Sequence, residues 1–487
     1  MRRWLVKTLR RVGVLLAVLA LIVFAGRGVD SLRGPPLELW HTFVPKELTP
    51  AELDRADWPA YLAAEQRIFA SVRAEVTDKL PAHARVPFDR YFADSPIYPG
   101  RFTQDFNRSF VLEPQGPLRG VAVLLHGLTD SPYSLRHVAH RYAAAGFVAI
   151  SIRLPGHGTV PGALTAVDWQ DWLAATRLAM REAKRRAGPG LPIHLVGYSN
   201  GAALALKYSL DALDAAEQPR ADRLVLVSPM VGITPFARFA GLAGIPAILP
   251  AFAQSAWLNL LPEFNPFKYN SFPVKAALES FRLTQVLQEA IHAHTRDGRI
   301  AGMPPVLAFQ SILDHTVVTK AVIDTLFGAL PNNGSELVLF DVNHNSRFEP
   351  LLTSDAETAV SRLLPPAPRG FRATLVTNIS PATAEVEART SEAGATGESR
   401  RPLGIDYPRD VYSLSHIALP FPLEDGLYGL TPDPTEDFGI RLGTMTARGE
   451  YGALTVGIDM LMRQSSNPFF SYMLERIDAG LPPPPAR

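Results

Sequence analysis

Residues 192–201 read Pro-Ile-His-Leu-Val-Gly-Tyr-Ser-Asn-Gly, and this stretch decides the fold that we expect. A short apolar strand runs into the turn Gly-Tyr-Ser-Asn-Gly at 197–201, and the helix-forming run 202–213 follows at once. Glycines let a strand and a helix approach closely around a residue that holds an unfavourable backbone conformation. The stretch therefore predicts a strand, a tight turn and a helix, with the Ser199 hydroxyl exposed on the turn.

Strands and helices alternate on both sides of this stretch. The expected strands are continuous runs of Val, Leu and Ile, which is typical of a parallel sheet with helices on both faces. They lie at 109–112, 121–125, 147–152, 223–228, 305–310 and 336–340, with helices at 135–145, 169–186 and 320–330. Alternation of this kind predicts an α/β architecture with a mostly parallel central sheet.

Composition divides the chain into four parts. We expect an N-terminal signal anchor (1–27), a linker with a helical segment (28–106), the α/β core (107–364) and a C-terminal extension that completes the core (365–487). Within the core, the alternation stops at the apolar insertion 231–303. We expect a helical lid there, because the insertion follows the carboxyl end of a strand, where ligands bind. A helical hairpin packed on the sheet is the alternative.

The charge balance argues against a nucleic acid partner. The chain of 487 residues has 48 Lys and Arg against 47 Asp and Glu, a net charge of +1, so it has no uniform field to attract DNA or RNA. It has no cysteine, which excludes disulfides, thiolate chemistry and Cys-ligated zinc or iron–sulfur sites.

The amino terminus has the pattern of a membrane-targeting segment. Basic residues between Arg2 and Arg11 precede the uncharged run 12–26, which Arg27 closes. The run is long for the core of a signal peptide and just short of a full helical span, which takes about 17–25 residues. We expect a single-pass anchor in a bacterial inner membrane, with the rest of the chain in the periplasm. Cleavage after Ala25 and secretion is the alternative.

Ser199 is the candidate nucleophile. A serine hydroxyl needs a base within hydrogen-bond reach and a further group that orients the base. Two backbone N–H groups should receive the oxyanion: that of Asn200, directly after the nucleophile, and that of Leu128, in the loop after strand 121–125. His126 shapes this loop, and we expect its imidazole to be structural.

Three motifs occur in order at strand ends: His126-Gly127, Gly156-His157-Gly158 and the turn at 197–201. Together they resemble the α/β-hydrolase superfamily, and within it the branch of serine aminopeptidases, monoacylglycerol lipases and carboxylesterases. The resemblance covers about residues 109–364. It implies the chain order nucleophile, acid, base, and hydrolysis of an ester or related acyl bond without a metal or other cofactor. His157, like His126, is expected to be structural.

The acid should follow Ser199 and lie at the end of a strand. Asp314 ends the run 306–313 and is followed by a helix, which is similar to the acid loop of the family. Asp341, at the end of strand 336–340, is the alternative.

The base is less directly indicated. His315 is adjacent to the candidate acid, so its ring would have to fold back. His344 follows strand 336–340, where the base of a minimal hydrolase would lie. His416 follows an expected strand at 410–415, and its Ser-His-apolar setting resembles the base loop of carboxylesterases, with a closing helix at 468–481. We expect His416 to be the base and keep His344 as the alternative.

The sequence thus predicts a serine hydrolase that cleaves carboxylic esters of hydrophobic small molecules through an acyl-enzyme. A peptidase or acyltransferase with the same three residues is one alternative. A non-catalytic envelope binding protein, with the apolar insertion as its docking surface, is another. The substrate and the oligomeric state stay open at this point.

Overall fold

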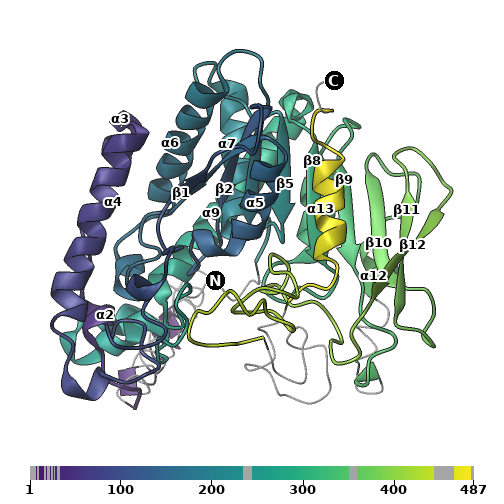
Figure 1. The fold of residues 1–487 in the computed structure, drawn as a ribbon. Coiled ribbons are helices and arrows are strands. Elements are labelled where there is room, and N and C mark those ends of the chain that lie inside the picture. The colour runs from purple at the N-terminus through teal and green to yellow at the C-terminus, as the bar shows by residue number, and fades with distance from the viewer. Residues whose placement is uncertain are drawn as a thin grey trace.

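The computed structural model describes residues 33–233, 244–349, 359–443 and 466–483, together with Leu352 and scattered positions between 7 and 29. Ten strands of these residues form one sheet (Figure 1). In spatial order they are β1 (Phe110–Leu112), β3 (Phe147–Ile152), β2 (Gly120–Leu125), β4 (Ile193–Tyr198), β5 (Arg223–Val227), β8 (Val306–Ser311), β9 (Glu336–Phe340), β10 (Arg372–Asn378), β11 (Glu385–Ser391) and β12 (Ser399–Asp406). The strands from β3 to β10 run parallel, whereas β1, β11 and β12 pair antiparallel at the edges.

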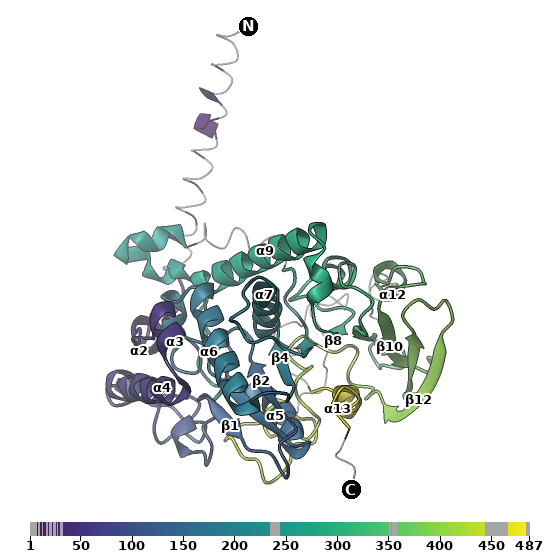
Figure 2. The ribbon, with the colours of Figure 1, turned by 90° about the horizontal axis from the view of Figure 1, so that it is seen from above.

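Helices cover both faces of this sheet, as the view from above makes clear (Figure 2). One face carries α6 (Trp169–Ala187), α7 (Asn200–Asp214) and α9 (Val274–Arg296), and the other carries α5 (Arg136–Ala144) and α13 (Phe470–Asp478). The predicted α/β class, with its mostly parallel sheet, is therefore confirmed.

Shorter elements complete the description. The remaining α-helices are α2 (Leu39–Thr42), α3 (Pro50–Arg55), α4 (Trp58–Val72), α10 (Thr319–Ala321) and α12 (Ala359–Leu363). Two π-helical segments lie at Arg73–Thr77 and Val322–Phe327. Turns of 3-10 helix lie at Ala82–Ala84, Pro99–Arg101, Pro132–Leu135, Pro161–Thr165, Ile245–Ile248, Pro250–Ala256 and Arg299–Gly302.

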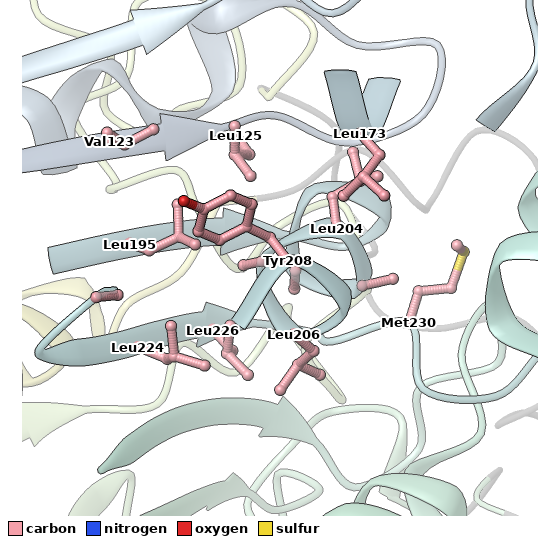
Figure 3. Packing of buried hydrophobic residues seen from close by; sticks show 14 of the residues in the cluster. Val123, Leu125, Leu173, Leu195, Leu204, Leu206, Tyr208, Leu224, Leu226 and Met230 are labelled. Carbon is pink, nitrogen blue, oxygen red and sulfur yellow. The ribbon is translucent and has the colours of Figure 1, made fainter. Parts of the chain in front are cut away.

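The two cores follow from side-chain alternation along the strands. In β2, Val123 and Leu125 belong to the core under α6 and α7, whereas Leu124 belongs to the core under α5 and α13. Figure 3 shows the first of these cores, where Leu204 and Leu206 of α7 pack with strand side chains. Burial on both faces explains why these strands read as unbroken apolar runs.

The helices before the sheet are capped and packed. Thr49 and Glu52 form a reciprocal capping box at the start of α3, and the Asp57 carboxylate accepts the N–H of Ala60 at the start of α4. Tyr61, on the buried face of α4, donates from its hydroxyl to the carbonyl of Arg153 at 2.7 Å. The helical part of 28–106 thus lies against the sheet at the end of β3.

The apolar insertion after β5 is only partly described, because 234–243 lie outside the described residues. A two-stranded ribbon of β6 (Trp257–Asn259) and β7 (Phe272–Pro273) leads into α9. The buried side of α9, with Leu283 and Leu287, belongs to the core that α6 and α7 form. The α9 helix therefore packs on the sheet's helical layer, and both the lid and the helical hairpin stay predictions.

The C-terminal extension adds three strands to one edge of the sheet, and its last helix, α13, then packs on the face that also carries α5 (Figure 1). Its first two strands are β10 and β11, and the closing helix predicted at 468–481 corresponds to α13. The strand predicted at 410–415 is wrong: this segment is a loop, apart from an isolated bridge residue at Val411. A further strand, β12, pairs with β11 at the edge and was not predicted.

The predicted anchor falls mainly on residues that the structure does not describe. Among those it does describe, no helix is both long enough and apolar enough to cross a membrane.

Candidate active site

The turn at 197–201 has the geometry that its glycines suggested. Ser199 lies between β4 and α7 with a φ of +53°, a conformation that side chains other than glycine rarely adopt. A Cβ atom on Gly201 would lie 2.0 Å from the Leu125 carbonyl oxygen, and one on Gly197 would lie 2.5 Å from the Cα of Ala202. Only glycine fits at these two positions, so the strained turn presents the Ser199 side chain beyond the end of the sheet.

Three of the predicted site residues meet at this point. His416 Nε2 lies 2.9 Å from Ser199 Oγ, and His416 Nδ1 lies 2.8 Å from Asp314 Oδ2. With Asp314 ionised, Nδ1 carries the proton and Nε2 is left to accept the hydrogen bond of the serine hydroxyl. The three side chains thus form one hydrogen-bonded row, although they come from positions 217 and 102 residues apart in the chain.

Asp314 is held as a carboxylate in spite of its burial. Its side chain is 0 % exposed, which alone would raise its pKa. The adjacent His416 and the backbone N–H groups of Thr316 and Val317, each 2.9 Å from Oδ1, act in the opposite direction, and the net pKa is lowered. Gln310 donates its side-chain amide to Oδ2 at 3.0 Å. The carboxylate is therefore both charged and fixed in orientation.

The alternative acid and base form a separate pair. His344 Nε2 lies 3.2 Å from Asp341 Oδ2, and the Thr377 hydroxyl donates to the same oxygen at 2.8 Å. The hydrogen bond with Asp341 raises the pKa of His344. His315, next to Asp314, is exposed. His344 and Asp341 thus bond to each other and not to Ser199.

The loop after β2 lies on the other side of Ser199. Thr129 in this loop has a φ of +62°, and its carbonyl accepts the N–H of Tyr269 at 2.8 Å. Across the described chain, neither the Leu128 N–H nor the Asn200 N–H donates to another protein group. The Asn200 N–H is next to Ser199 in sequence. The Leu128 residue is near Ser199 in space, since both line one cavity.

The two motif histidines are packed structural groups. His126 accepts the N–H of Leu154 at Nε2 (3.0 Å), so its proton is on Nδ1, which donates to the Gly127 carbonyl (2.9 Å). Burial lowers the pKa of His126 well below its usual range, and that of His157 to about 3. Both rings are neutral at physiological pH, and they hold the loops after β2 and β3 together as expected.

A cavity of about 390 Å³ opens over Ser199 and His416. Its apolar lining consists of Leu128, Met230, Ile233, Phe272, Ala277 and Ile417. The insertion after β5 supplies much of the wall, including Phe272 and Lys268. Sequence reasoning assigned the insertion to the top of the site but did not identify Lys268, because a lone lysine in a polar loop carries no motif. In the part of the chain that the structure describes, no group of acidic and histidine side chains could hold a metal ion.

A buried ion cluster holds the tail that carries His416. Asp425, nine residues after His416, is 0 % exposed and lies 2.5 Å from Arg136 Nη1 of α5. The hydroxyl of Tyr133 donates to it at 2.9 Å, and His137 Nε2 lies 3.0 Å from it. Burial would raise the pKa of Asp425, but the Arg136 guanidinium lowers it well below its usual range. Sequence reasoning missed this cluster, which joins positions 289 residues apart.

Part of the chain is similar to known proteins. Residues 116–331 match the model of a family described as "Serine aminopeptidase, S33". A thermostable monoacylglycerol lipase of Bacillus sp. (strain H-257) is 29% identical over 217 residues, which are 44% of this chain and 78% of the relative.

Solved structures also resemble about half of the chain. One, from a study of the metagenome-derived lipolytic enzymes LipS and LipT, is 22% identical with a TM-score of 0.38, and the match covers 49% of this chain and 88% of that one. Another is a soluble variant of the monoglyceride lipase of Saccharomyces cerevisiae with a substrate analogue, 14% identical with a TM-score of 0.37, covering 47% and 81%.

Proposed function

From its place among the α/β hydrolases, as a serine hydrolase of the esterase and lipase type, we propose that this protein cleaves carboxylic esters through an acyl-enzyme on Ser199. One observation carries the proposal: the hydrogen-bonded row from Ser199 Oγ through the His416 ring to the Asp314 carboxylate. A serine, a base and a group that orients the base are the minimum for this chemistry.

In the first half-reaction Ser199 Oγ attacks the ester carbonyl while His416 Nε2 takes the hydroxyl proton. The imidazolium that forms lies 2.8 Å from Asp314, whose buried negative charge stabilises it. The oxyanion accepts hydrogen bonds from the N–H groups of Leu128 and Asn200, which have no protein partner among the described residues. His416 then gives its proton to the departing alcohol, which breaks the ester bond.

The second half-reaction repeats these steps with water. His416 removes a proton from water as the oxygen attacks the acyl-enzyme, and the proton returns to Ser199 Oγ when the acid leaves. No redox partner enters this cycle.

The substrate that we propose has a hydrophobic acyl part. Six apolar side chains line the cavity, and apolar pockets of this size bind ligands mainly through buried hydrocarbon surface. The relative from Bacillus is named as a monoacylglycerol lipase, which supports an acyl ester of a small alcohol such as glycerol. The insertion that walls the cavity is the element that we propose to act as its lid.

The cellular place that we propose is the outer side of a bacterial inner membrane, with 1–27 as a single anchor. The basic residues before the uncharged run 12–26 support this orientation.

The test compares alanine variants of the two candidate bases. We expect Ser199→Ala and His416→Ala each to lower kcat/KM on 4-nitrophenyl esters by at least about 10⁴-fold. His344→Ala should keep most of the activity, because His344 pairs with Asp341 and not with Ser199. A fluorophosphonate probe should label the wild type and not Ser199→Ala. Unchanged hydrolysis by Ser199→Ala would refute the proposal, and matched amide substrates would separate an esterase from a peptidase.

A further inference from the structure

Among the described residues that line the cavity over Ser199, Lys268 is the one Lys or Arg, and there is no Asp or Glu. A lysine ammonium is strongly hydrated, so an apolar pocket holds one at a cost unless an anion accompanies it. The charge of Lys268 is therefore a feature that an esterase for neutral, hydrophobic substrates does not need.

Comparison with the other half-buried lysines sharpens this point. Lys207 pairs with Asp211, and Lys275 pairs with Asp168. Lys268 is likewise half-buried, yet no carboxylate of the described residues lies within ion-pair distance of it. Lys207 and Lys275 thus each have a counter-charge, whereas Lys268 has none within ion-pair distance among the described residues.

The buried acid on which the charge of Lys268 acts does not pair with it directly. Asp130 lies in the loop after β2, and burial raises its pKa to about 6 although the charge of Lys268 acts in the opposite direction. The Asp130 carboxylate accepts the N–H of Ser131 at 3.0 Å and forms no ion pair with Lys268. Among the described residues, no carboxylate thus lies within ion-pair distance of the Lys268 ammonium.

The backbone of Lys268 is fixed from several sides. Its N–H donates to Asn265 Oδ1 at 3.2 Å, and its carbonyl accepts from Arg90 Nη1 at 3.3 Å. The next residue, Tyr269, donates its N–H to Thr129 in the loop that also carries Leu128. Arg90 is 2 % exposed, so this scaffold is buried. The backbone of Lys268 is therefore fixed relative to the loop that carries Leu128, which lowers the cost of ordering this residue against a substrate.

We propose that Lys268 selects esters that carry an anionic group, a carboxylate or a phosphate, within a few bonds of the carbonyl that Ser199 attacks. The inference rests on the proposed ester hydrolysis and names the substrate class for the same site. Because Lys268 and Ser199 line one cavity of about 390 Å³, both contact a single bound molecule. The anion forms a charge-assisted hydrogen bond with the ammonium and takes no part in bond making or breaking.

The experiment uses two matched pairs of substrates below their micelle concentrations. In the phosphate pair, a short-chain monoacylglycerol is compared with the same compound phosphorylated on its glycerol. In the carboxylate pair, the mono-4-nitrophenyl ester of adipic acid is compared with its methyl ester. We expect the wild type to prefer the anionic member of at least one pair by about 10-fold or more in kcat/KM, and the pair that responds identifies the anion.

Variants then assign the preference to one side chain. We expect Lys268→Gln to lower the anionic-to-neutral ratio by about 10- to 100-fold and Lys268→Arg to keep most of it. Lys320→Gln, on a lysine that is exposed and paired with Asp324, is the matched control and should leave the ratio unchanged. In the wild type, the preference should also weaken as salt rises from about 0.05 M to about 0.5 M.

The outcomes separate this inference from the function it builds on. Equal or lower activity on both anionic substrates, with neutral esters cleaved, would overturn the role of Lys268 and leave the esterase proposal intact. Loss of activity on every ester in wild-type protein that also resists the fluorophosphonate probe would overturn the esterase proposal. If Lys268→Gln does not fold, the wild-type ratio and its salt dependence decide the question alone.

Discussion

The ion cluster at Asp425 should control the stability of the tail that carries His416. In Asp425→Asn the side chain keeps its size but loses its charge, while Arg136 stays 1 % exposed beside it. One carboxylate now accepts from Tyr133, Arg136 and two backbone N–H groups, and an amide can serve only part of this set. Removal of one partner of a buried ion pair typically destabilises a protein by about 3–5 kcal/mol. Glu436 Oε2, 2.6 Å from Arg136 Nη2, still pairs with the guanidinium, so we expect the lower end of this range.

We expect a loss of this size in the free energy of unfolding of Asp425→Asn, measured by urea denaturation with tryptophan fluorescence. Activity should fall in the same variant under native conditions, because Asp425 and His416 belong to one loop. Glu424→Gln is the matched control, since the neighbouring carboxylate is exposed and forms no ion pair with another described side chain. A loss below about 1 kcal/mol, as a surface ion pair gives, would refute the assignment of the cluster as the anchor of the tail.

Two further predictions concern His344 and the amino terminus. The pair with Asp341 raises the pKa of His344. The stability that this pair contributes is therefore complete below the unfolded pKa of about 6.5 and is lost as pH rises through the folded pKa. Thermal melts should show His344→Gln to be less stable than the wild type at pH 5.5, with the difference disappearing by pH 9. If 1–27 is an uncleaved anchor, alkaline carbonate should leave the full-length protein in the membrane pellet, whereas release into the supernatant would refute the anchor.

The parts of the site that follow strands directly were accessible from the sequence. Ser199 and Asp314 each come right after an apolar run, and parallel strands bring such positions to one edge of a sheet. His416 was also identified, but through an expected strand at 410–415 that is a loop in the structure. The position of His416 late in the chain and its local motif identified the residue. The conformation of the backbone that leads to it was not predicted.

Other features had no local signal. β12 reads Ser-Arg-Arg-Pro-Leu-Gly-Ile-Asp, with most side chains exposed, because an edge strand tolerates proline, glycine and charge where a central strand does not. The pairing of Arg136 with Asp425 joins positions 289 residues apart, and a charged residue in a sequence does not indicate its partner. Lys268 acquires its proposed role only because, among the described residues, no carboxylate lies within ion-pair distance of it.

The loop that carries His344, the alternative base, explains how the C-terminal tail can supply His416. After β9, Asn343 donates its side-chain amide to the carbonyl of Val411 at 2.7 Å, and its backbone N–H donates to the carbonyl of Tyr412 at 2.8 Å. Tyr407 donates its hydroxyl to the carbonyl of Asp341 at 3.1 Å. The loop where a minimal hydrolase would carry its base thus holds the segment that leads to His416. Because the two loops are bonded at several points, an insertion of three strands between them keeps the imidazole within 2.9 Å of Ser199.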